Sequence, residues 1–136
     1  MKERKENSQK PHFLFVGENR SELAKKNGYT WQNVPDMSGH CSRKLFVALR
    51  KAGIEPREHD FINTWDDDGN PQEIIPNGRI VVAMGLTVQK ELSVRGISFI
   101  PVVHPAARGI WCRQSEYNKI IFDSLNDYVR LTSIKK

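Results

Sequence analysis

Residues 79–85, RIVVAMG, form an apolar run that ends in glycine, and the residues that follow, LTVQKELSVRG (86–96), have the pattern of a short helix. Because nearly every position of the run is apolar, it predicts a strand buried on both faces. Gly96 is well placed to end the helix. A buried strand that leads directly into a helix is typical of a parallel sheet covered by helices.

The same kind of unit recurs on both sides of this stretch. Further strands are predicted at HFLFVG (12–17), HDFINTW (59–65) and ISFIPVVHP (97–105). Helices are predicted over 38–54 and roughly 114–130, each with apolar residues along one side: Leu45, Ala48, Leu49 and Ala52 in the first, Tyr117, Ile121, Leu125 and Tyr128 in the second. Gly53 is suited to end the first of these helices. The segment between the first strand and the first helix is expected to be a polar loop around a short helical turn. Together these elements predict a three-layer α/β/α fold with a central four-stranded parallel sheet.

The length of 136 residues favours one domain, which we place at residues 12–131. Residues 1–11, MKERKENSQKP, are expected to be a flexible basic arm, and residues 132–136 a basic tail. The arm has no apolar signal core, and no apolar stretch is long enough to span a bilayer. We therefore expect a cytoplasmic protein without a membrane partner, and a monomer.

The charge of the chain favours an anionic partner. The net charge is +5 and the sequence pI is about 9.4, which favours an encounter with anions such as nucleic acid without requiring it. The two cysteines, Cys41 and Cys112, are far apart, so they predict neither a metal framework nor a disulfide scaffold. We expect them to pack as reduced thiols.

Polar residues follow the predicted strands. Glu18 and Asn19 come after the first strand, Asn63 lies at the end of the second, and His104 ends the fourth. Ligands of open parallel sheets bind beyond the carboxyl ends of the strands. We therefore expect these side chains to meet along one edge of the sheet, with Asn19, Asn63 and His104 around a single pocket sized for a pyrimidine.

The order of these motifs resembles that of the uracil-DNA glycosylase superfamily. The matching stretches are FVGEN, MSGHCSRKLFVALRKAGI, FINTW, IVVAMG and VVHPAAR, and they span about residues 12–130. They are similar to the small branches with a Gly-Glu-Ala-Pro-Gly or Gly-Ile-Asn-Pro-Gly motif, a Ser-Gly helix start, a strand ending in Asn and a His-Pro-Ser strand end. The resemblance implies a monofunctional hydrolase that removes uracil or a related pyrimidine from DNA without a metal or cofactor.

The resemblance also implies roles for single residues. His104 would stabilise the anion of the departing base, and Asn19 would position the attacking water, although an amide cannot act as a general base. Asn63 would read the base by accepting from N3–H and donating to O4, with Glu18 beside the motif or the base. Tyr29 and Trp31 are the candidates for stacking on the extruded base.

Contacts with single- or double-stranded DNA are implied for two segments. Ser38, Gly39 and His40 would meet a phosphate through backbone amides at a helix start. Arg108 and Trp111 follow His104 and would press into the duplex while the base is flipped.

The sequence departs from the family pattern at two of these motifs. Arg20 stands where the family has proline after the catalytic position, and Ala106 replaces the serine of His-Pro-Ser. Arg20 and Asn19 favour an alternative, a catalytically inactive DNA-binding or regulatory member of the same fold. A second alternative is an enzyme that acts on free nucleosides or nucleotides.

Overall fold

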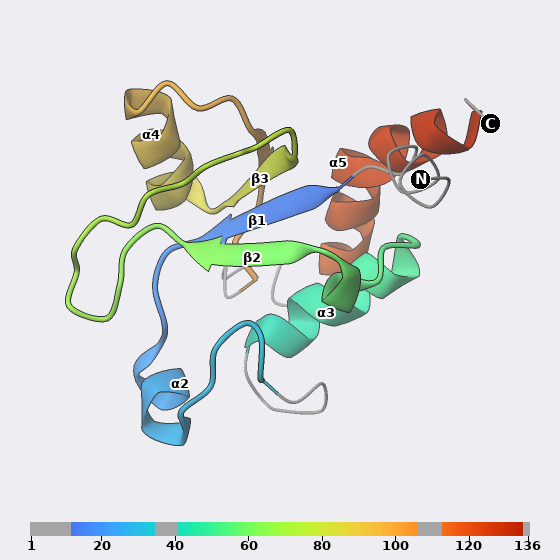
Figure 1. Ribbon diagram of the computed structural model, residues 1–136. Coiled ribbons are helices and arrows are strands. Elements are labelled where there is room, and N and C mark those ends of the chain that lie inside the picture. Colours follow the sequence, from blue (N-terminus) through green and yellow to red (C-terminus); the bar gives the residue numbers. More distant parts are fainter. Residues whose placement is uncertain (1–11, 35–40, 106–112, 135–136) are drawn as a thin grey trace, which may run out of the picture.

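The computed structural model describes residues 12–34, 41–105 and 113–134 (Figure 1). Its elements are β1 (Phe13–Gly17), α2 (Glu22–Asn27), α3 (Cys41–Lys51), the 3₁₀ turn η1 (Pro56–Glu58), β2 (Asp60–Asn63), β3 (Ile80–Met84), α4 (Leu86–Val94), β4 (Ile100–Val102) and α5 (Gln114–Ile134). The strands form one parallel sheet in the order β2-β1-β3-β4. This arrangement confirms the predicted three-layer α/β/α fold.

The strand order creates a switch point in the centre of the sheet. From β1 the chain passes to β2 on one side and then to β3 on the other side of β1. The register pairs Gly17 with Asn63 across β1 and β2, and Met84 with Val102 across β3 and β4. All strands therefore end at the same edge, which we call the carboxyl rim: the residues that end or follow the strands, Gly17, Glu18, Asn63, Gly85 and His104.

Two apolar clusters hold the layers together. On one face, Phe13, Phe15, Val82 and Met84 pack with residues of α3 and α5. On the other face, Leu14, Val16, Val81 and Ala83 pack with Val88 and Leu92 of α4. Figure 1 shows α3 and α5 on the side of the sheet opposite α4. Strands covered on both faces explain why their sequences are apolar without alternation.

Helix α3 ends as its sequence predicts. The N–H of Gly53 donates to the carbonyl of Arg50, and the N–H of Ile54 donates to the carbonyl of Leu49. Gly53 has a φ of +84°, and Ile54 is buried after it. This is the Schellman arrangement that favours glycine, and it turns the chain toward β2.

Two predicted bounds are corrected. Strand β4 covers only Ile100–Val102 of the predicted 97–105, and its central Pro101 has no N–H to give to a ladder. Helix α5 continues past residue 130 to Ile134, since the sequence offers no glycine or proline to stop it. Along α5, Tyr117, Ile121 and Leu125 are buried as predicted, whereas Tyr128 is exposed. No helix in the described ranges is long and apolar enough to cross a membrane.

Candidate functional site at the carboxyl rim

Glycines at the ends of β1 and β3 make room for the two polar side chains of the rim. A Cβ atom at Gly17 would lie 2.9 Å from Oδ1 of Asn63, and a Cβ atom at Gly85 would lie 3.2 Å from Cβ of His104. Gly85 also has a φ of +97° and a ψ of 156°, a conformation open almost only to glycine. Close packing therefore connects Asn63 to β1 and His104 to β3.

Asn63 is held by hydrogen bonds at both its side chain and its backbone. Its Oδ1 accepts a hydrogen bond of 2.8 Å from the indole Nε1–H of Trp31. Its backbone carbonyl accepts from Nε2 of Gln72 at 3.0 Å. The side-chain oxygen of Asn63 is thus already bonded within the protein. Of the two groups predicted to read a base, the amide nitrogen Nδ2 is the one left for a ligand.

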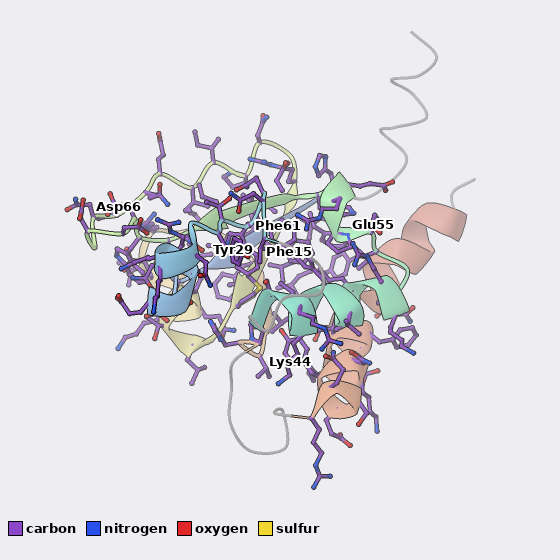
Figure 2. The ribbon with its side chains drawn as sticks, turned by 90° about the horizontal axis from the view of Figure 1, so that it is seen from below. Phe15, Tyr29, Lys44, Glu55, Phe61 and Asp66 are labelled. Atoms are coloured by element: carbon purple, nitrogen blue, oxygen red, sulfur yellow. The ribbon has the colours of Figure 1, made fainter. Side chains whose placement is uncertain are left out.

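The ring of Trp31 is itself fixed by stacking. It lies 5.1 Å from the ring of Phe61 at an interplanar angle of 24°, and Phe61 stacks on Phe15 at 4.9 Å and 21°. Figure 2 shows Phe15 and Phe61 beside each other close to α3, with Tyr29 next to them. The predicted stacking residue Trp31 therefore lies beside Asn63, with one face of its ring against Phe61.

A single guanidinium holds the chain around Trp31. Arg57 donates to the backbone carbonyls of Trp31, Gln32 and Val34 at 3.2, 3.3 and 2.6 Å. It also lies 4.9 Å above the ring of Phe46. Bonds from one rigid, always charged group to three nearby carbonyls hold this segment in place.

His104 is positioned through the backbone that precedes it. The hydroxyl of Tyr117 donates to the carbonyl of Val103 at 2.9 Å, and Nε2 of Gln89 donates to the carbonyl of Val102 at 3.0 Å. Helices α5 and α4 thus fix the end of β4 from both sides. Burial lowers the pKa of His104 below its ordinary value, and the nearby charge of Glu18 opposes that shift. The imidazole is consequently neutral at pH 7 and can donate an N–H to a developing anion.

Glu18 lies between the two halves of the rim. The carbonyl of Gly17 before it accepts from both N–H and Oγ1 of Thr64, at 2.8 and 2.7 Å. The carbonyl of Glu18 accepts from the N–H of Trp65 at 3.0 Å. Its side chain is exposed and acts on His104 by charge. The rim therefore brings Glu18 and His104 within electrostatic reach of each other.

Asn19 is exposed on the loop that follows β1, and among the described residues its side chain makes no hydrogen bond. The guanidinium of the next residue, Arg20, forms two parallel hydrogen bonds with the carboxylate of Asp67. It also donates to the carbonyl of Tyr29 at 3.1 Å. The hydrogen bond with Arg20 lowers the pKa of Asp67. The ion pair between Arg20 and Asp67 thus tethers the loop after β1. In the family that the sequence resembles, this position is a rigid proline.

Among the cavities lined by described residues, no single pocket holds both Asn63 and His104, in contrast to the prediction; the two side chains line different cavities. A cavity of about 420 Å³ contains Asn63, Trp31, Trp65, Arg20 and Gln72 among its lining residues. A cavity of about 560 Å³ beside β4 is lined by His104 with apolar residues of β4 and α5 and with Leu86 and Gln89 of α4. Tyr29 lines a third space of about 70 Å³ next to Trp31. Asn63 and His104 also lie at opposite edge strands, whose backbones are about 14 Å apart at ordinary strand spacing.

Several predicted contact residues lie outside the described part of the chain. These are Ser38, Gly39, His40, Arg108 and Trp111, the proposed DNA contacts. Cys112 and the side chain of Cys41 also lie outside it. Their predicted roles stay predictions.

Four residues that position the site were not predicted from the sequence to do so. Arg57, Gln72 and Gln89 act on backbone carbonyls, and a contact of that kind leaves no pattern in the sequence. Tyr117 was predicted only as an apolar helix residue, although a buried tyrosine hydroxyl usually finds a partner. That rule was the one available signal for its contact with Val103.

Comparison with models of known protein families gives no match, and comparison with curated proteins gives no significant match. The resemblance of the motifs to uracil-DNA glycosylases therefore stays a prediction. Within the described ranges, no three histidine, cysteine, aspartate or glutamate side chains are grouped so that they could hold a metal ion.

Proposed function

We propose that the protein is a DNA base glycosylase that hydrolyses the N-glycosidic bond of a flipped uracil or related pyrimidine. The observation that supports this most strongly is the carboxyl rim, where Asn63 and His104 are both held in fixed positions around the switch point of the sheet. Such switch points are the usual ligand sites of open parallel sheets. The motif resemblance supplies the chemical class of the ligand.

In the proposed reaction the bond between C1′ and the base nitrogen breaks, and its electron pair leaves with the base. Positive charge then develops on the sugar, and water attacks C1′. The neutral His104, desolvated at the end of β4, would donate its N–H to the oxygen that carries the developing negative charge. A preorganised donor of this kind contributes about 10²–10³ in rate.

Asn19 would act on the water and the sugar through its carbonyl dipole. Its exposed position after β1 leaves it accessible to a substrate entering at the rim. Because an amide does not take up a proton at neutral pH, the proton of the attacking water passes to solvent, and the base anion is protonated from solvent after it leaves. We therefore expect slow turnover compared with an enzyme that has a carboxylate at this position.

The proposal is tested with labelled oligonucleotides that contain one uracil, thymine or cytosine, single-stranded or opposite guanine or adenine. Hydrolysis leaves an abasic site, which hot alkali converts to a strand break. The proposal predicts breaks at uracil or a related pyrimidine and none at matched cytosine. Absence of breaks on every substrate would refute it.

Two observations favour a second candidate, a DNA-binding protein of the same fold without activity. Asn63 and His104 line separate cavities, and Asn19 makes no hydrogen bond within the described residues. Under this alternative the same oligonucleotides bind without strand breakage. Under either candidate, binding to phosphates predicts that affinity falls steeply as salt increases.

A further inference from the structure

The contact between Trp31 and Asn63 determines which end of the carboxamide faces a ligand. An indole nitrogen is a donor and never an acceptor, so the atom of Asn63 that lies 2.8 Å from Nε1 is the oxygen. Turning the carboxamide over would place two donors against each other. The orientation therefore follows from the chemistry of the partner, and amide nitrogen Nδ2 points away from Trp31.

The backbone of Gly17 passes close to the same oxygen. A Cβ atom at Gly17 would lie 2.9 Å from Oδ1, so only glycine leaves room for the carboxamide here. Within the described residues Nδ2 has no hydrogen-bond partner, and Asn63 is only partly buried.

The side chain of Trp31 cannot easily rotate away from Asn63. Its ring stacks on Phe61, and its carbonyl is bound by Arg57. Both Trp31 and Asn63 line the cavity of about 420 Å³. A ligand that enters this cavity would meet the N–H groups of a carboxamide whose oxygen is already used.

We propose that Trp31 is the specificity-determining positioning residue of this site: its indole N–H holds the Asn63 carboxamide so that Nδ2 alone faces the base. The site then selects bases with a ring carbonyl oxygen at that position over bases with an amino group there. This inference rests on the proposed function. It adds that Nδ2 of Asn63 donates to a carbonyl of the base, and that Oδ1 does not accept from the neighbouring ring N–H of the base.

The test compares binding of two single-stranded oligonucleotides that differ only at a central nucleotide, a 2′-fluorinated deoxyuridine or deoxycytidine. The fluorine disfavours the cationic sugar, so the glycosidic bond survives the measurement. Backbone contacts are the same in both, and the ratio of the dissociation constants reports the base alone. Fluorescence anisotropy would be measured for the wild type, Trp31→Phe and the matched control Trp65→Phe, which changes another indole of the same cavity.

We expect the wild type to prefer uracil about ten-fold, the equivalent of roughly one hydrogen bond. Trp31→Phe keeps an aromatic ring against Phe61 but loses the N–H, so its preference should fall to about one. Trp65→Phe should keep the preference. If the wild type prefers uracil and Trp31→Phe keeps that preference, the inference is wrong, while the proposed function still stands.

A second measurement needs no folded Trp31 variant. In the wild type, the ¹⁵N-labelled indole N–H of Trp31 should exchange slowly with solvent, and Asn63→Ala should accelerate this exchange. Rapid exchange in the wild type overturns the positioning role, whatever the oligonucleotides do. If neither oligonucleotide binds, the proposed function is wrong, and so is the proposed preference for uracil. Slow exchange of the indole N–H would in that case still support the contact between Trp31 and Asn63.

Discussion

The two halves of the carboxyl rim are held in different ways. At the β2 side, the functional group of Asn63 is itself bonded, because Oδ1 accepts from an indole that stacking fixes in place. At the β4 side, helices α4 and α5 bind the carbonyls before His104, and the imidazole is confined by its burial and by Gly85. The difference indicates that the β2 side fixes which atoms a ligand meets, whereas the β4 side fixes where a titratable ring is placed.

The largest effect that this comparison predicts is on the reaction rate. Replacing His104 with alanine should lower the rate of base removal by about 10²–10³, the usual contribution of one preorganised donor, with little change in DNA affinity. Single-turnover cleavage and anisotropy measure the two quantities. His12→Ala is the matched control, since His12 precedes β1 at the opposite end of the sheet. Normal cleavage by His104→Ala would remove His104 from the mechanism.

The next effect is on stability at the β4 side. Gly85→Ala should lower the free energy of unfolding by about 1–3 kcal/mol, because alanine strongly disfavours this backbone conformation. The new methyl would also press on His104 at 3.2 Å. Urea denaturation measures the loss. Gly28→Ala is the control, as Gly28 has a φ of +71° with nothing within 4 Å, so a similar loss in both variants would show that the contact with His104 is unimportant.

A smaller effect is expected at the β2 side. Gly17→Ala should cost about 1 kcal/mol, the low end for an over-packed site, because the carboxamide of Asn63 can rotate away from the methyl. The rotation should break its bond to Trp31 and change the indole NMR signal. In a double-mutant cycle with Asn63→Ala the cost should become smaller, since the obstructing oxygen is gone and the next contact of the methyl is Trp31 at 3.3 Å. An unchanged cost would place the strain elsewhere.

The smallest effect is a dependence of stability on pH. Burial lowers the pKa of both His59 and His104, so the unfolded chain binds more protons just below pH 6.5. Stability should therefore fall as the pH decreases from 7 through this range. His59 also accepts the N–H of Phe13 on Nδ1 at 3.1 Å, a bond that protonation removes. Urea midpoints between pH 7 and pH 5 should drop less in His59→Phe and in His104→Ala, whereas Asn63→Ala should follow the wild type.

Much of the fold could be predicted from the sequence because the local signals agree with one another. Apolar runs without alternation marked the buried strands, and Gly53 marked the end of α3 at the correct residue. The strand order could not be predicted, because the pattern within each strand does not indicate which strand it pairs with. The bounds of β4 depend on pairing at a sheet edge with Pro101, which periodicity does not report.

The candidate site was predictable only at the level of which residues reach the rim. Asn63, His104 and Glu18 all lie there, as expected from residues that end or follow strands. Their hydrogen-bond partners were not predictable, because Trp31 and Asn63 are far apart in the chain and meet only through the folding of the loop after β1. For the same reason, the hydrogen bond that occupies Oδ1 of Asn63 could not be predicted.

The short strand β4 has a consequence for how copies of the protein behave together. It is an outer strand of the sheet, and its exposed Pro101 interrupts the row of N–H groups. Such an edge is a poor template for strand addition, by which sheet proteins often aggregate. A concentrated solution should therefore resist fibril growth from this border, and replacing Pro101 with valine would be the direct way to weaken that protection.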